Sequence, residues 1–145
     1  MNSADPHNRL KMRAMEELKA LLEQSHAIRL TEVHQSRGCR IDLLAKIDVY
    51  GHIHTLACAV KGQRNGRATD EDLRRLCDDV GRQTEVMMPI LIAPHLPRKL
   101  QTLCIEKKVG FLDFEGNGRL VLDEAFIGRR TLHHGPASHP NAPVT

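Results

Sequence analysis

Residues 40–61, RIDLLAKIDVYGHIHTLACAVK, decide the fold of this chain. Aliphatic and β-branched residues alternate with polar ones on both sides of the centre, which predicts strands at residues 40–49 and 53–61. Tyr50 and Gly51 between them are typical of a tight turn. The stretch therefore predicts an antiparallel β-hairpin.

The turn also predicts which residues of the hairpin face one another. Val49 and His52 are expected to bracket it. This register places Asp42 opposite Ala59. Lys61 is two residues beyond Ala59, so it points to the same face of the sheet and lies diagonally from Asp42. We therefore expect an acid and a lysine to converge at one end of the hairpin.

Hydrophobic periodicity outside the hairpin predicts helices alternating with further strands. The apolar stripes, together with Thr69 before three acids and Gly81 or Gly110 as end signals, are typical of amphipathic helices. The expected helices cover residues 8–24, 70–81 and 97–110. The expected strands cover residues 28–33, 88–93, 111–114 and 119–122, of which the last two form a second hairpin around residues 115–118.

The apolar run MPILIA at residues 88–93 indicates where the centre of the sheet lies. A continuous apolar run of this length is typical of a strand covered on both faces. Elements before and after it are expected to extend the sheet in both directions. The order of elements predicts an α/β fold in which a mixed β-sheet is flanked by helices on both sides.

Length and composition predict one folded domain. The chain has 145 residues, of which 41% are hydrophobic, and a net charge of +3. We expect a flexible N-terminus at residues 1–8, a folded domain at 9–130 and a disordered tail at 131–145, where prolines and polar residues dominate. The sequence shows no apolar run of membrane-spanning length and no legible secretory signal, so a cytoplasmic protein is expected.

The cysteines are expected to be reduced and part of the core. Cys39, Cys58, Cys77 and Cys104 are widely spaced in apolar segments, and no C-x-x-C pair indicates a zinc site. No cofactor is expected, because the sequence has neither a P-loop nor a dinucleotide-binding glycine pattern.

Three potential metal ligands occur at even spacing on one expected strand. His52, His54 and Cys58 should therefore face the side opposite Ala59 and Lys61. Three ligands along one extended strand span too long a distance to converge on one ion. We expect ordinary packing and solvent exposure for them.

Asp42 in Arg-Ile-Asp-Leu-Leu, then Ala59-Val60-Lys61 at the end of the next strand, then a loop and a helix, resembles the PD-(D/E)XK, or restriction-endonuclease-like, superfamily. The resemblance spans residues 28–122 and implies a restriction-endonuclease-like mixed sheet. In active members an aspartate and an E-x-K or D-x-K tripeptide hold a divalent metal, and the lysine orients or activates the water that hydrolyses a phosphodiester. The resemblance thus implies a metal-ligand role for Asp42 and a catalytic role for Lys61.

Ala59 is the departure from this pattern, because the family has glutamate or aspartate there and alanine has no ligand atom. A degenerate site is therefore expected. If the site is active, it needs Mg²⁺ or Mn²⁺ and a relocated carboxylate. The candidates by residue type are Glu16, Glu17, Asp48 and Asp113. Gln63 is a further candidate site residue, which could bind a metal or phosphate weakly or be a solvated loop residue.

Two later segments carry a second resemblance. Pro89-Ile-Leu-Ile-Ala-Pro94, then a helix, then Val109-Gly-Phe-Leu-Asp-Phe-Glu-Gly-Asn117 resembles the nuclease-like domain of bacterial regulators related to abortive-infection (type IV) antitoxins. In those relatives the domain commonly accompanies a DNA-binding helix-turn-helix. This chain has one expected helix before its first strand, so a full winged-helix domain is absent.

A cationic loop points to a possible partner. Lys61, Arg64 and Arg67 lie in a stretch without acids that directly precedes a helix N-terminus. Such an arrangement can contact a phosphate backbone, and equally it can be a solvated loop. We take these three residues as the candidate nucleic-acid contacts, with DNA as the favoured partner.

The sequence thus predicts a catalytically degenerate restriction-endonuclease-like domain that acts as a nucleic-acid-binding or regulatory module. One alternative is a divalent-metal-dependent nuclease with a relocated carboxylate. The other is a protein-interaction subunit of a toxin–antitoxin or mobile-element system, with a protein partner and no chemistry. Cleavage that disappears on replacing Asp42 or Lys61 would favour the nuclease.

Overall fold

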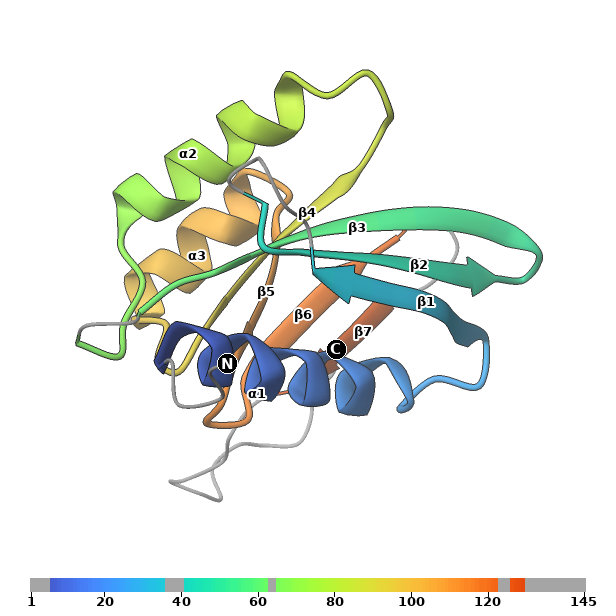
Figure 1. Cartoon of the computed structure of the whole chain (residues 1–145), viewed down its shortest axis with the longest axis horizontal. Helices are drawn as coiled ribbons and strands as arrows, with labels where there is room; N and C mark the ends of the chain where they lie inside the picture. Colours follow the sequence, from blue (N-terminus) through green and yellow to red (C-terminus); the bar gives the residue numbers. More distant parts are fainter. Residues whose placement is uncertain (1–5, 36–40, 63–64, 123–125, 130–145) are drawn as a thin grey trace.

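The computed structural model describes residues 6–35, 41–62, 65–122 and 126–129, in which the chain forms three helices and seven strands (Figure 1). Gln63, Arg64, Cys39 and the expected tail at 131–145 lie outside these residues. The elements, in chain order, are α1 (Pro6–Leu22), β1 (Ile28–Gln35), β2 (Leu43–Val49), β3 (His52–Val60), α2 (Asp70–Gly81), β4 (Met88–Ala93), α3 (Arg98–Glu106), β5 (Gly110–Asp113), β6 (Gly118–Val121) and β7 (Phe126–Arg129).

All seven strands belong to one mixed sheet, and they stand in the order in which they occur in the chain. β1, β2 and β3 pair antiparallel, β3, β4 and β5 pair parallel, and β5, β6 and β7 pair antiparallel again. β4 is therefore the central strand, as the apolar run predicts. This confirms an α/β fold with a mixed sheet, and a restriction-endonuclease-like arrangement is compatible with it.

The hairpin of β2 and β3 has the predicted register. Val49 pairs with His52, and Leu43 pairs with Cys58 at the far end. Tyr50 and Gly51 have φ angles of 53° and 88°, as a two-residue turn that follows the twist of the strands requires. The next backbone contact extends the ladder, because the amide of Asp42 donates to the carbonyl of Cys58 at 2.9 Å.

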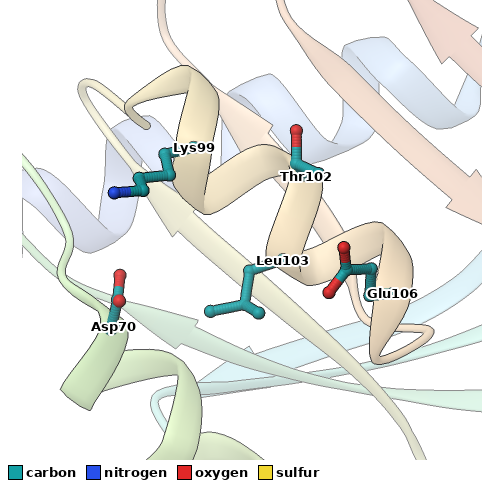
Figure 2. Close-up of a pocket in the computed structure, with 5 residues that line it drawn as sticks. All are labelled: Asp70, Lys99, Thr102, Leu103 and Glu106. Atoms are coloured by element: carbon teal, nitrogen blue, oxygen red, sulfur yellow. The ribbon is translucent and has the colours of Figure 1, made fainter.

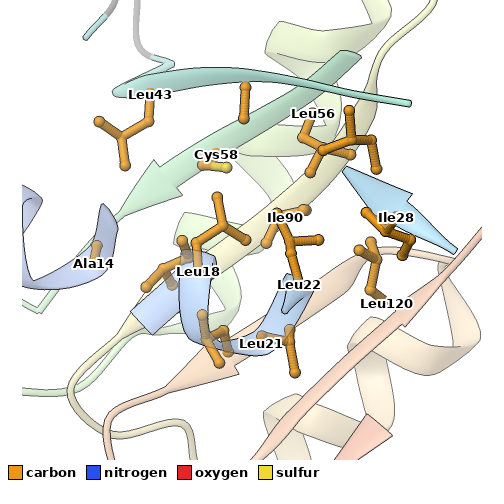
Figure 3. Packing of buried hydrophobic residues seen from close by; sticks show 14 of the residues in the cluster. Ala14, Leu18, Leu21, Leu22, Ile28, Leu43, Leu56, Cys58, Ile90 and Leu120 are labelled. Carbon is orange, nitrogen blue, oxygen red and sulfur yellow. The ribbon is translucent and has the colours of Figure 1, made fainter. Parts of the chain in front are cut away.

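The helices cover both faces of the sheet, as predicted. α1 packs on one face, where its leucines meet β2, β3 and β4 (Figure 3). α2 and α3 are the crossovers between parallel strands, and they cover the opposite face. Neighbouring residues of β4 enter different clusters, Ile90 beneath α1 and Leu91 beneath α2 and α3. Burial of the central strand on both faces explains its uninterrupted apolar sequence.

The beginning of α2 follows its sequence signal. Thr69 Oγ1 accepts from the amide of Asp72, and Asp72 Oδ2 accepts from the amide of Thr69 at 2.9 Å, which completes a capping box. Three acids occupy the first turn of the helix, where they oppose the positive end of its dipole.

α3 ends earlier than expected. The helix begins at Arg98 behind Pro97 and stops at Glu106, whereas the sequence signal placed its end at Gly110. Lys108 takes the left-handed conformation (φ 61°) that ends the segment. Gly110 instead opens β5, where a Cβ atom would come within 3.2 Å of the carbonyl oxygen of Arg119. This glycine is required for close packing in the sheet.

Other elements also differ from the expectation: β1 continues to Gln35 instead of ending at residue 33, and β2 begins at Leu43 instead of residue 40. α1 begins at Pro6 and ends at Leu22, two residues earlier at each end than the apolar stripe indicated. β7 has no counterpart among the predicted strands. In the part of the chain that the structure describes, no helix is long and apolar enough to cross a membrane.

Candidate functional site

The carboxyl ends of β3, β4 and β5 lie at one edge of the sheet, because these strands are parallel. The loop after β3, the start of α3 and the start of α1 gather at the same edge, on the left in Figure 1. In open α/β sheets this edge is where ligands bind. The candidate site residues Asp42 and Lys61 both belong to it.

Asp42 completes the hydrogen bonding of the hairpin at this edge. Its Oδ2 accepts from the amide of Val60 at 2.8 Å, while its own amide donates to Cys58. The side chain thus replaces the carbonyl that a longer β2 would offer. Because Val60 is fully buried, its amide requires such a partner.

The other carboxylate oxygen of Asp42 faces two basic residues of α1. Oδ1 lies 3.8 Å from Nζ of Lys11 and 3.6 Å from Nε2 of His7. The side chains of Lys11 and Asp42 are mostly buried, at 16% and 13% exposed. α1 therefore brings two basic groups to the site. They were missed because the amphipathic pattern of residues 8–24 indicates a helix without indicating its neighbours.

Lys61 lies next to this cluster but is not paired with Asp42. Its amide donates to the carbonyl of Ile92 at 2.9 Å, which holds the residue beside β4. Among the described residues, no hydrogen bond or ion pair joins Lys61 to Asp42. Ala59 is 2% exposed and packs in the cluster beneath α2 and α3. The hairpin register is confirmed. The charge partners of Asp42, however, come from α1, which packs on the face of the sheet opposite Ala59.

A glycine fixes the path of the loop that follows Lys61. Gly62 has φ +94°, and a Cβ atom there would meet Pro94 Cδ at 3.0 Å and the amide nitrogen of Arg67 at 3.1 Å. The amide of Gly66 donates back to the carbonyl of Gly62 at 3.0 Å. The loop therefore turns tightly against the end of β4, and Arg67 forms a β-bridge with His95.

We use the name cationic edge for the basic residues of the segments that meet at this end of the sheet: His7, Lys11, Lys61, Arg67 and Arg98. The last of these is the first residue of α3 and is exposed. The carboxylates of Asp42 and Glu115 also lie at this edge, and Oε1 of Glu115 is 2.7 Å from Nδ1 of His95. Each of them is paired with a basic group.

The arginines Arg74 and Arg75 of α2 pair with acids of the same helix. Arg74 forms ion pairs with Glu71 and with Asp78, and Arg75 pairs with Glu71 at 3.0 Å. These charges lie on the outer side of α2 and neutralise one another. The bonds to Arg74 and Arg75 lower the pKa of Glu71, so it stays ionised.

The four acids considered as a relocated carboxylate are placed by the structure as follows. Glu16 is exposed on α1, and Glu17 pairs with Arg13 at 3.0 Å. Asp48 lies at the turn end of the hairpin, where it accepts from the amide of Gly51 at 2.7 Å.

Asp113 ends β5 at the candidate edge, fully buried, and holds the following turn. It accepts from the amides of Glu115 and Asn117 and from Nδ2 of Asn117. This is the turn-supporting role that the sequence left open. Within the described ranges, no group of three or more His, Cys, Asp or Glu residues could hold a metal ion.

Cys58 lies on the face opposite Ala59, as the alternation predicts, and packs beneath α1. Burial raises the pKa of its thiol to about 12, and the charge of Asp42 contributes to the rise. Cys58, Cys77 and Cys104 are free cysteines, as expected.

Neither a protein-family model, nor a curated protein, nor a solved structure matches the chain. The functional proposal therefore rests on the chain's own residues and their contacts.

Proposed function

We propose that this chain is a nucleic-acid-binding or regulatory module with a degenerate restriction-endonuclease-like core, and that it holds a phosphate backbone at the cationic edge without cleaving it. The observation that carries the proposal is the continuity of that edge. Lys11 contacts Asp42, Asp42 contacts the residue before Lys61, and the loop from Lys61 leads through Gly62 to Arg67. Lys and Arg side chains on one edge can neutralise the phosphates of a nucleic-acid backbone.

The side chains at the edge favour binding over hydrolysis. Ala59 supplies no ligand atom, and both oxygens of Asp42 already have partners in the Val60 amide, Lys11 and His7. Binding a divalent ion would require Asp42 to exchange these partners. Catalysis of phosphoryl transfer by a metal needs carboxylates that are free to ligate it. DNA is the proposed partner, and the three described cysteines, which are free, support the proposed cytoplasmic location.

Salt-dependent binding tests the proposal. The affinity for a fluorescent DNA duplex of about 20 base pairs is measured by anisotropy in chelator, at several salt concentrations. The wild-type protein is compared with the variant Lys61→Ala, Arg64→Ala, Arg67→Ala. The matched control is Arg74→Ala, Arg75→Ala, Arg82→Ala, which removes the same number of cations from α2 and its end.

We expect the logarithm of the affinity to fall linearly with the logarithm of salt concentration. Each phosphate that the protein no longer neutralises changes the slope by about 0.9, so the site variant should lose about two to three units of slope and the control close to none. Equal affinity of the site variant and the wild type would show that Lys61, Arg64 and Arg67 do not contribute to DNA binding. A single-stranded DNA and an RNA duplex in the same assay identify the preferred nucleic acid.

A further inference from the structure

A histidine and a glutamate meet between two loops beside the cationic edge. His95 follows β4 and Glu115 follows β5, and Nδ1 of the imidazole lies 2.7 Å from Oε1 of the carboxylate. The two side chains are 42% and 52% exposed. Within the described ranges, Nε2 of His95 forms no hydrogen bond or ion pair. The imidazole therefore contacts the carboxylate through one nitrogen and keeps the other for a ligand.

The backbone of His95 is fixed to the loop that carries Arg67. The two residues form a β-bridge, and the carbonyl of His95 accepts from the amide of Ala68 at 3.3 Å. Backbones paired in this way lie about 4.8 Å apart. The bridge therefore makes His95 a neighbour of a residue of the cationic edge.

The position of Glu115 depends on a buried carboxylate. Its amide donates to Oδ1 of Asp113 at 3.0 Å, and Asp113 is fully buried. The amide of Phe114 donates to the carbonyl of Pro94 at 3.2 Å, which joins the same turn to the residue before His95. Main-chain contacts thus hold the two loops together without the ion pair. Exposed ion pairs also contribute little stability on their own, so the charges of this pair are open to another role.

The charged groups around His95 come from three segments. Glu115 faces it from the turn after β5, Arg67 lies beside it in the loop before α2, and Arg98 begins α3 three residues further along the chain. Lys99 instead lines a hollow of about 310 Å³ between α3 and the start of α2 (Figure 2). Among the groups that surround the imidazole, Glu115 is acidic and the two arginines are basic. Its charge therefore opposes that of the cationic edge.

We propose that His95 is a proton-dependent phosphate contact at the cationic edge, an inference that rests on the proposed function. The protonated imidazole neutralises Glu115 through Nδ1 and donates from Nε2 to a phosphate oxygen. The neutral imidazole leaves Glu115 with its full negative charge beside Arg67, which repels a phosphate backbone. Histidine is the side chain whose charge changes between about pH 5 and pH 8. Nucleic-acid binding at this edge is therefore coupled to the uptake of a proton.

The affinity for DNA at two pH values tests the coupling. Binding to the same fluorescent duplex is measured by anisotropy in chelator at constant ionic strength, at about pH 6 and about pH 8. The affinity of the wild-type protein should rise by about three- to tenfold from the higher to the lower pH, because the edge gains one positive charge. His95→Gln should lose most of this rise. Glu115→Gln removes the repelling charge and should raise the affinity at about pH 8 by about two- to fivefold.

His34→Gln is the matched control. His34 lies on β1 and also faces a carboxylate, because its Nε2 is 3.6 Å from Oε2 of Glu32. Both side chains are about as exposed as those of the pair at the edge. The control variant should therefore retain the full rise in affinity of the wild type. Circular dichroism at both pH values verifies that each variant keeps its fold.

The outcomes separate this inference from the proposed function. A rise in affinity that His95→Gln retains in full would overturn the inference and leave the proposed function standing. Equal affinity of the wild-type protein at both pH values would do the same. Absence of DNA binding at both pH values would overturn the proposed function and the inference with it.

Discussion

Nζ of Lys11 lies 3.8 Å from Oδ1 of Asp42, so a residue of α1 neutralises the carboxylate at the end of the β2–β3 hairpin. The other oxygen of Asp42 accepts from the amide of Val60. Asp42 is thereby both a structural acceptor and the counter-ion of a basic residue at the candidate edge. These two roles make different predictions for substitutions that remove the charge alone or the whole carboxylate.

Asp42→Ala should destabilise the fold by about 1–3 kcal/mol, because it leaves the buried amide of Val60 without an acceptor. Asp42→Asn retains an acceptor oxygen and should cost less. The free energies of unfolding are measured in urea. Equal stability of Asp42→Ala and the wild type would contradict the structural role.

Asp42→Asn should also strengthen DNA binding by about two- to fivefold, because Lys11 loses the charge that neutralises it. Anisotropy in chelator measures the change, with Lys11→Met, Asp42→Asn as the control that should not show the gain. A loss of binding in Asp42→Asn would show that the carboxylate itself contributes to binding.

Ala59→Glu should destabilise the protein without creating a metal site. Ala59 is 2% exposed and packs among apolar side chains, so a carboxylate there is costly by about 2–5 kcal/mol. Ala59→Gln has the same size without the charge and separates the steric cost from the electrostatic one. Thermal unfolding with and without Mn²⁺ is the measurement. A rise in melting temperature with Mn²⁺ in the glutamate variant alone would mean that one missing carboxylate is the only defect.

Gly62→Ala should be more damaging than Gly51→Ala, although both glycines have positive φ angles. A Cβ atom at Gly62 would meet Pro94 and the backbone of Arg67, whereas at Gly51 it meets nothing within 4 Å. We expect about 1 kcal/mol of destabilisation at Gly51 and about 2–4 kcal/mol at Gly62. Denaturation measures both, and DNA binding should weaken only in Gly62→Ala, because its loop carries Lys61 and Arg67. Equal costs at the two positions would contradict the tight loop.

The backbone of the hairpin could be predicted because side chains in a strand alternate with a period of two. Once Tyr50 and Gly51 set the turn, every pair from Val49 and His52 outward follows. The C-terminal end of α3 could not be predicted from such a periodic pattern. Gly110 resembles a helix end signal, but its role is set by contact with a strand that follows later.

The partners of Asp42 lay beyond the sequence for a similar reason. Its register opposite Ala59 is a local property, whereas its contacts with His7 and Lys11 depend on how α1 docks on the sheet. Helical periodicity indicates which side of α1 is buried but not which residue lies at the edge. Lys61 and Arg67 could be proposed as candidates because they adjoin a strand end and a helix start.

The buried thiols give a prediction in alkaline solution. Burial raises the pKa of the Cys58 and Cys104 thiols from 9.0 to about 12. The charge of Asp42 raises the pKa of Cys58 further, and Cys77 does the same for Cys104. Both thiols should therefore resist iodoacetamide at pH 8 until the chain unfolds. Mass spectrometry of the labelled peptides, with and without urea, measures this protection. Rapid labelling of either residue in the native protein would contradict its burial.

The same raised pKa values make stability depend on pH. The stabilising effect of the protonated thiols is complete below pH 9 and is lost progressively above it, because only the unfolded chain ionises there. The urea concentration at the midpoint of unfolding should decrease as the pH is raised from 8 to 10. It should decrease less in the variant Cys58→Ala, Cys104→Ala. Identical pH dependence in both proteins would contradict the assignment to these thiols.

The most direct test of the central claim is an agarose gel of supercoiled plasmid mixed with the purified protein in Mg²⁺, in Mn²⁺ and in chelator, beside the Asp42→Ala protein. We predict that the wild-type protein retards the plasmid in every lane, chelator included, and leaves it supercoiled. Nicked or linear plasmid that requires the metal and is absent with Asp42→Ala would contradict the claim and establish a nuclease despite Ala59.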